Sequence, residues 1–427
     1  MSPSQAVEKQ INSPARILFA SLVGTAIEYF DFAIFATAAV LVFPKLFFSA
    51  ANPTVSALAS LATFGVAFVA RPIGGALFGH FGDRFGRKKT LVAALAMMGA
   101  STFSIGVLPS YQSIGLAAPL LLALCRFGQG IGLGGEWGGA MLLSVENAPP
   151  AKRAFYGMFP QFGTPIGSLL ANGTFLLLSR TLTERQLFAF GWRIPFLASS
   201  VLVLLGLYVR LSIAETPVFL AAQQRGVHVR VPCLTVFKRH FREIVTGVML
   251  CMAGFVGFYL LLVFTLSWGT IALHYDRRTL LTSQMVGLAS SMVVMPLAAR
   301  LADRGRRPAL MGIAVLIGIF GLGMAKLFTA GTGGVLVMMV VGMMPIAMLM
   351  TPVGTVMAEQ FPTAVRYTGI SIAYSLAGIF GASLTPYIAT WLATTHGLPY
   401  VGYYLSASAA ITILGLAMIR ETRGETL

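Results

Sequence analysis

Twelve long apolar stretches run through this chain and leave it few possible folds. A helix needs about 20 mostly apolar residues to span a bilayer. The stretches that meet this length cover residues 17–43, 57–78, 90–108, 118–143, 156–179, 191–212, 243–267, 279–299, 309–328, 334–357, 367–393 and 400–419. Only 10% of the 427 residues are charged, whereas an average soluble protein has about 25%. We therefore predict an all-α membrane protein with twelve transmembrane helices.

The positive charge of the chain is distributed unevenly between the two sides of the predicted membrane. Of the 30 lysines and arginines, 21 lie in alternate inter-helix segments and at the two ends, and six lie in the opposite loops. The remaining three are Arg71, Arg126 and Arg193. Cytoplasmic segments carry such an excess of lysine and arginine, so both termini are predicted to be cytoplasmic. The net charge of +16 therefore reports topology, and we predict no nucleic-acid partner.

Two sequence signals occur at matching places in both halves of the chain. Residues 79–89, after the second helix, contain Asp83, and residues 301–308, after the eighth, contain Asp303. A glutamate followed seven positions later by an arginine stands after the fourth and tenth helices, as Glu146 with Arg153 and Glu359 with Arg366. Internal duplication of this kind is common among transporters. The interpretation is two pseudo-symmetric six-helix bundles, 1–212 and 243–427, joined by a cytoplasmic linker, 213–242.

At these residues the chain resembles the major facilitator superfamily, and more closely its metabolite:proton symporter family. That family includes the shikimate, α-ketoglutarate, citrate and proline/betaine transporters. The motifs that carry the resemblance are residues 24–32 (GTAIEYFDF), 71–74 (RPIG), 126–130 (RFGQG), 134–140 (GGEWGGA), 191–196 (GWRIPF), 215–219 (ETPVF) and 361–369 (FPTAVRYTG). The match covers nearly the whole chain. One departure is that the loop at Asp303 is one residue shorter than the usual family pattern of Asp-Arg-x-Gly-Arg-Arg.

Five ionisable residues lie well inside the predicted helices, all in the first half of the chain. They are Glu28, Asp31, Arg71, Arg126 and Glu136. A charged side chain at the bilayer centre costs about 2.5–3.5 kcal/mol on insertion scales, so such residues usually have a function. Glu28, Asp31, Arg126 and Glu136 are the predicted proton-coupling residues. The alternative role of Glu28 is packing or hydrogen bonding. The alternative role of Glu136 is to brace the cytoplasmic side of the protein.

Asp31 and Arg126 are the predicted core of the mechanism. Asp31 precedes Pro44 by thirteen residues, or about 20 Å of helix, and Arg126 lies about 12 Å inside the outer end of its helix. The two side chains are predicted to pair or to exchange partners. An anionic substrate that engages Arg126 would release Asp31 to take a proton. The resemblance implies the same roles for these two residues, and the alternative is a permanent structural ion pair.

Substrate binding is assigned to Arg126 and to polar groups on several other helices. These groups are Arg71, Gln129, Gln161, Tyr259 and Tyr374. The alternative role of Arg71 is to brace two helices against each other. The alternative role of each polar residue is packing between helices. Two membrane arginines favour a carboxylate as cargo, because guanidinium groups bind carboxylates with two hydrogen bonds.

The loops after the second and eighth helices form the predicted cytoplasmic gate. By resemblance, charges in these loops pair with helix ends when the cytoplasmic side is closed. The predicted gate residues are Asp83, Arg84, Arg87, Arg153, Asp303 and Arg307.

The sequence carries no sign of an enzyme or of a bound cofactor. Residues 130–135 satisfy GxGxxG, but a dinucleotide site needs a preceding strand, and here small residues in an apolar helix indicate close helix packing. The three cysteines lack metal-ligand spacing, so we expect no metal, no catalytic residue and no cofactor, with the proton gradient as energy source.

These patterns together predict a proton-coupled symporter. Its expected cargo is a small organic acid taken up across a bacterial inner membrane by alternating access. A symporter of a zwitterion such as proline or betaine is the close alternative, and a metabolite exporter is another. The expected partners are the substrate, protons and the lipid bilayer, with the protein acting as a monomer.

Overall fold

The computed structural model describes residues 13–48, 53–224 and 232–422. Within these ranges, twelve helices are long and apolar enough to cross a membrane. They coincide with the twelve predicted stretches, so the predicted class, an all-α protein with twelve membrane-spanning helices, is confirmed. The orientation of the termini stays a prediction.

The first six spanning helices begin and end close to the predicted positions. Their bounds are α2 Pro14–Leu41, α4 Pro53–Phe85, α5 Arg87–Val107, α7 Ala117–Val145, α8 Arg153–Thr181 and α10 Arg193–Leu211. Short helical segments connect them, namely α3 Phe43–Leu46, α6 Tyr111–Ile114, η1 Pro150–Lys152, α9 Glu184–Gln186 and η2 Leu187–Gly191.

The second six spanning segments include two that are interrupted by a π-helical turn. Their bounds are α13 Phe241–Tyr259 with η3 Leu260–Phe264 and α14 Thr265–Ile271, α15 Arg277–Arg304, α16 Arg306–Thr329, α17 Gly331–Gln360, α18 Arg366–Gly378 with η5 Ile379–Ser383 and α19 Thr385–Thr395, and α20 Leu398–Met418. The 3-10 turn η4 Thr363–Val365 precedes α18.

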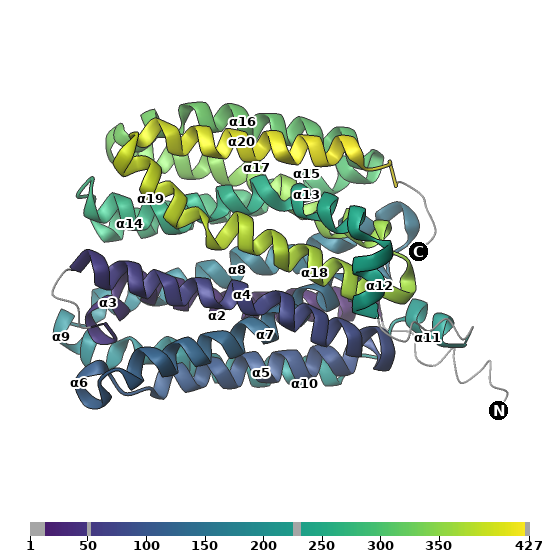
Figure 1. Ribbon diagram of the computed structural model, residues 1–427, viewed down its shortest axis with the longest axis horizontal. Helices are drawn as coiled ribbons and strands as arrows, with labels where there is room; N and C mark the ends of the chain where they lie inside the picture. Colours follow the sequence, from purple (N-terminus) through teal and green to yellow (C-terminus); the bar gives the residue numbers. More distant parts are fainter. Residues whose placement is uncertain (1–12, 49–52, 225–231, 423–427) are drawn as a thin grey trace.

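The two sets of helices lie side by side. Figure 1 shows the first set in purple to blue below and the second in green to yellow above. Between them, α8 packs on α15 and α17, and α18 packs on α4 and α7. The predicted linker contains α11 Pro217–Gln224 and α12 Pro232–Arg239. Its basic residues Arg225, His228 and Arg230 lie outside the described residues, and the three domain boundaries stay a prediction.

The π-helical turn in the seventh span is supported by a side chain of the neighbouring helix. A π turn misaligns backbone carbonyls, and a carbonyl left without a partner in a membrane costs several kcal/mol. The Gln284 amide of α15 donates to the carbonyls of Leu261 and Leu262, at 3.3 and 2.8 Å. The interruption is therefore compensated from outside the helix.

Helices α4 and α7 approach each other closely through glycine. A Cβ atom added to Gly134 would overlap the carbonyl oxygen of Arg71, and one added to Gly130 would lie 2.7 Å from the Cα of Ala67. Small residues allow this approach because lipid supplies no hydrophobic drive for helix association, so van der Waals contact must hold the pair. The glycine run in α7 therefore serves packing.

We predict that Gly134→Ala lowers the stability of the purified protein by about 1–3 kcal/mol, because overpacking forces α4 and α7 apart. Gly323→Ala in α16 is the matched control. A Cβ atom there meets nothing within 4 Å, so alanine should stabilise by up to about 1 kcal/mol. Thermal unfolding in detergent measures both, and equal midpoints for the two variants would refute the packing role.

Candidate functional site

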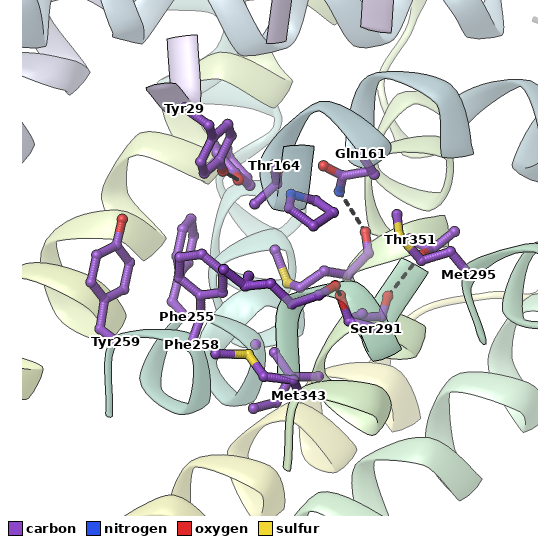
Figure 2. A pocket seen from close by; sticks show the side chains of 17 residues that line it. Tyr29, Gln161, Thr164, Phe255, Phe258, Tyr259, Ser291, Met295, Met343 and Thr351 are labelled. Carbon is purple, nitrogen blue, oxygen red and sulfur yellow. Dashed lines mark hydrogen bonds between the residues drawn. The ribbon is translucent and has the colours of Figure 1, made fainter. Parts of the chain in front are cut away.

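A central cavity lies between the two sets of helices, and mostly aromatic and apolar side chains line it. In this conformation its free volume is about 50 Å³. Figure 2 shows Tyr29 and Gln161 of the first set across from Phe258 and Met343 of the second. Of the predicted substrate-binding residues, Gln161, Tyr259 and Tyr374 line this cavity.

A second cavity, of about 30 Å³, adjoins the first and shares Tyr29, Phe258 and Tyr259 with it. Asn172 of α8 and Gln284 of α15 also line it. The Asn172 amide donates to the Gln284 oxygen at 3.5 Å, which joins the two sets of helices. Tyr29, Phe258 and Tyr259 therefore stand between the two cavities.

Tyr374 connects the two sets of helices beside the central cavity. Its hydroxyl is 3.1 Å from that of Tyr29, and its ring stacks on Trp137 at 3.5 Å between centroids. Close by, the Gln161 amide donates to the Met350 carbonyl at 2.5 Å. These contacts join α2, α7 and α8 to α17 and α18, so movement of either set must break them.

Asp31 is buried, with 1% of its surface exposed. Its carboxylate accepts hydrogen bonds from two hydroxyls, those of Thr102 on α5 at 2.8 Å and of Ser199 on α10. In the described part of the chain it forms no ion pair with Arg126 within 4 Å. The expected direct pairing is therefore absent from this conformation.

Arg126 is completely buried and lies among aromatic rings. Its guanidinium carbon is 4.1, 4.5 and 5.2 Å from the ring centroids of Phe35, Phe32 and Phe64. Such contacts are worth about 0.5–2 kcal/mol each. Nη1 donates to the Gln129 oxygen at 2.8 Å, whereas Nε and Nη2 have no hydrogen-bond partner among the described residues. Two adjacent donors are thus available to a ligand.

Asp31 and Arg126 are nevertheless connected by hydrogen bonds. The Gln129 amide nitrogen donates to the Thr102 hydroxyl at 2.6 Å, and that hydroxyl donates to Asp31. The chain runs from Arg126 through Gln129 and Thr102 to Asp31. Gln129, predicted as a substrate ligand, lies here between the two charges.

Glu28 and Arg71 form a loose buried ion pair one helical turn from Asp31. Their nearest atoms, Glu28 Oε1 and Arg71 Nη2, are 3.6 Å apart. Within the described residues, neither Glu28 oxygen accepts a hydrogen bond. The Arg71 guanidinium also lies 5.2 and 5.1 Å from the rings of Phe32 and Phe68. This weakly held pair is suited to exchanging partners.

An aromatic layer separates both arginines from the cavities. Neither Arg71 nor Arg126 is among the residues that line them. The layer consists of Phe32, Phe64, Phe68 and Tyr259, whose ring centroids lie 5.1–6.1 Å apart. Phe32 and Tyr259 themselves line the second cavity. A substrate must displace part of this layer to reach Arg126.

Glu136 has a strong partner that the sequence analysis did not assign. Both of its oxygens accept from Arg210, one at 2.6 Å, and both side chains are buried. Arg210 also donates to the Leu91 carbonyl at 2.9 Å. This bidentate pair braces α7 against α10 and α5, which favours the bracing alternative. Arg210 was counted among the topology-setting charges because it stands near a helix end.

At the predicted cytoplasmic end, Asp83 caps a helix of the opposite set. It accepts from the backbone N–H groups of Tyr367 and Thr368, at 3.3 and 3.0 Å, in the first turn of α18. A carboxylate is favourable there, because the first N–H groups of a helix lack partners and carry partial positive charge. Arg87 forms an ion pair with the same carboxylate, with 3.3 Å between Arg87 Nη1 and Asp83 Oδ1.

Asp303 makes the same contact in the other direction. It accepts from the N–H groups of Ala154 and Phe155, at 3.0 and 3.1 Å, in the first turn of α8. Arg306 pairs with it at 2.9 Å. Arg87 is four residues after Asp83 and Arg306 three after Asp303, so the shorter second loop keeps the aspartate–arginine contact.

Two glutamates complete this closed end. Glu146 pairs with Arg366 at 3.4 Å, and Glu359 pairs with Arg153 at 3.7 Å, each across the two sets of helices. The repeated Glu–Arg signal therefore pairs between the halves. Two predicted gate residues make other contacts in the described structure: Arg84 lies over the Phe85 ring, and Arg307 donates to the Ala417 carbonyl of its own half.

Sequence reasoning missed the neutral partners of the buried charges. Thr102 and Ser199 stand on predicted helices without any local motif, and only the packing of α5 and α10 against α2 reveals them. A single buried threonine or serine in a membrane helix usually bonds its own backbone, so the sequence offered no signal for either.

The chain is similar to known proteins over its whole length. A family model for the sugar (and other) transporters matches residues 17–231. The inner membrane metabolite transport protein YhjE of Escherichia coli K12 is 50% identical, over 98% of this chain and 96% of its own. The shikimate transporter of that organism is 35% identical over 96% and 95%. The proline/betaine transporter of Salmonella typhimurium is 34% identical over 96% and 84%.

The fold is also similar to solved structures. The major facilitator superfamily proton:xylose symporter XylE, bound to 6-bromo-6-deoxy-D-glucose, superposes with a TM-score of 0.78. The match covers 97% of both chains at 22% identity, so it bears on the fold alone.

We predict that Asp303→Ala opens the predicted cytoplasmic end. Loss of one capping carboxylate costs about 1 kcal/mol, or about a five-fold shift toward the open state. A single cysteine at the cavity residue Ser291, in a background without the other cysteines, should react about five-fold faster with a membrane-impermeant maleimide added from that side. Arg84→Ala is the control and should leave the rate unchanged. Equal maleimide reaction rates in Asp303→Ala and the parent protein would contradict the proposed role of Asp303 in closing this end.

Proposed function

The chain belongs to the sugar (and other) transporter family of the major facilitator superfamily, and from this we propose that it is a proton-coupled symporter of a small carboxylate-bearing metabolite. It is a multi-pass membrane protein and a transporter rather than an enzyme. The proposed location is a bacterial inner membrane, as in the name of YhjE, with both termini in the cytoplasm.

The observation that carries the proposal is the state of the Arg126 guanidinium. It is buried, it lies behind Phe32, which lines the second cavity, and its Nε and Nη2 donors have no partner among the described residues. These two donors point from the same edge of a planar group, which matches the two oxygens of a carboxylate. A buried charge with unused donors is costly unless a ligand completes it. We take a carboxylate to be that ligand.

Asp31 is the proposed proton carrier. It is a buried carboxylate held by two neutral hydroxyls instead of a cation. A carboxylate in such a place accepts a proton without breaking an ion pair, whereas Glu136 is committed to Arg210. Glu28, loosely paired with Arg71, is the second candidate. Energy then comes from the proton gradient, and we propose no cofactor.

The closed end supports alternating access as the mode of transport. Asp83 and Asp303 each cap a helix of the opposite half, so both contacts break when the halves separate at this end. The cargo and proton are proposed to enter from the other side, and the halves then rock around the central cavity. The protein is proposed to act as a monomer, because each part of the site comes from one chain.

We predict that Asp31→Asn abolishes accumulation driven by a pH gradient but keeps counterflow exchange, in which no net proton movement is needed. Arg126→Ala should weaken carboxylate binding about ten- to hundred-fold, through loss of charge-assisted hydrogen bonds. Reconstituted liposomes loaded with shikimate or glycine betaine as first probes measure transport, and thermal shift measures binding. Arg84→Ala is the charge-removal control. Full gradient-driven accumulation by Asp31→Asn would exclude the proton role.

A zwitterion with a quaternary ammonium group is the second candidate cargo. The central cavity presents the aromatic rings of Tyr29, Phe255, Phe258, Tyr259 and Tyr374. Aromatic faces attract quaternary ammonium groups, and the proline/betaine transporter is a relative at 34% identity. Such a cargo also carries the carboxylate that Arg126 would bind.

Phe258→Leu separates the two kinds of cargo. For glycine betaine it should cost about 0.5–2 kcal/mol of binding, because leucine has no π face for the cation. Binding of a plain carboxylate such as shikimate should change little. Thermal-shift titration of the variant and the parent with both compounds gives the comparison, and equal weakening of both would remove the cation–π role.

A further inference from the structure

The hydrogen bonds between Arg126 and Asp31 all run in one direction. A guanidinium can only donate, so Gln129 must present its oxygen to Arg126, and its NH₂ group then faces Thr102. The Thr102 oxygen accepts this N–H, which leaves its own proton to donate to Asp31. The contact with Arg126 therefore keeps the Gln129 NH₂ group facing Thr102, so that Thr102 accepts from Gln129 and keeps its own proton for another acceptor.

The Thr102 hydroxyl has a second acceptor within reach. Its oxygen is 2.8 Å from Asp31 Oδ2 and 3.0 Å from the carbonyl oxygen of Met98, one turn earlier in α5. One hydroxyl proton serves one acceptor at a time. When the proton points to Met98, the same oxygen can accept a hydrogen bond from a protonated Asp31. Thr102 thus has two arrangements, one for each protonation state of the aspartate.

We propose that Thr102 is the positioning residue through which Arg126 controls the protonation of Asp31. This inference rests on the proposed function and adds the link between its two halves. A substrate carboxylate that draws Arg126 away from Gln129 frees the amide to turn. Thr102 then loses its donor and rotates toward Met98, and Asp31 takes a proton and donates it to the threonine oxygen.

No competing charge on the neighbouring helices replaces this link in the described structure. Arg126 of α7 is the charged group that acts on Asp31, while α5 and α10 supply the hydroxyls of Thr102 and Ser199. On α2 itself Glu28 is the nearest acid, and it pairs with Arg71 of α4. Ser199 binds Asp31 but has no bond to Gln129 or Arg126, so it provides a matched comparison.

The test is a double-mutant cycle read by infrared spectroscopy. Purified protein in nanodiscs is titrated with pH, and the C=O band of protonated Asp31 is identified by its loss in Asp31→Asn. In the parent protein, Arg126→Ala should move the midpoint of this band by about one pH unit, as loss of one charge-assisted hydrogen-bond chain implies. In the Thr102→Val background the same substitution should move it little. In Thr102→Ser and in Ser199→Ala the full shift should persist.

Equal shifts in the Thr102 and Thr102→Val backgrounds would overturn the proposal, because the coupling would then act through space. Loss of the shift in Ser199→Ala as well would also overturn it. If Thr102→Val does not fold, Thr102→Ala provides the same comparison. Transport of shikimate or glycine betaine tests the proposed function separately. A parent protein without gradient-driven accumulation defeats proton coupling, whereas an intact infrared cycle still establishes the link through Thr102.

Discussion

The cost of a charge in a low-dielectric interior governs this structure, and the buried carboxylates of Glu28, Asp31 and Glu136 meet that cost in three different ways. Glu136 forms a bidentate pair with Arg210 and ties helices together. Glu28 has a distant partner and no hydrogen bond among the described residues. Asp31 accepts from two hydroxyls and, in the described part of the chain, has no cation within 4 Å. Only a carboxylate without a permanent countercharge can change its protonation cheaply. The three acids thus range from structural to available, with Asp31 at the available end.

The closed end follows from the duplication of the chain. A helix that begins inside a bundle leaves N–H groups without partners, and in this fold α8 and α18 receive theirs from Asp303 and Asp83 of the opposite half. The two repeated Glu–Arg signals are likewise exchanged between halves. In the closed state, contact between the two halves therefore satisfies these two helix ends. The same groups face water once the halves part, so the closed and open states both satisfy them, and neither is strongly trapped.

How much was predictable depended on whether a feature is local. The number of helices, and the five ionisable residues well inside them, follow from hydropathy alone, because lipid excludes any other arrangement of an apolar stretch. The hydrogen-bond and ion-pair partners of these charges are harder to predict from the sequence. Arg210 stands near a helix end, where an arginine usually reports topology, and Thr102 belongs to no motif. The roles of both residues depend on contacts with neighbouring helices, which the sequence does not specify. The expected pairing of Asp31 with Arg126 rested on depth along two helices, and depth does not fix which faces meet. A hydrogen-bonded chain through Gln129 and Thr102 separates them instead.

The two halves contribute different properties to the cavity. The first half supplies the buried charges and is tightly packed, since glycines bring α7 against the α4 backbone. The second half supplies aromatic rings next to interrupted helices: Tyr259 directly precedes the π turn of the seventh span, and Tyr374 stands five residues before that of the eleventh. A π turn has backbone groups held by side chains, such as Gln284, which can be exchanged without unfolding a helix. Phe32, Phe64 and Phe68 of the aromatic layer stand on α2 and α4 of the tightly packed first half, whereas Tyr259 directly precedes the π turn of the seventh span. The layer is therefore expected to rearrange most easily at Tyr259 when a substrate moves toward Arg126.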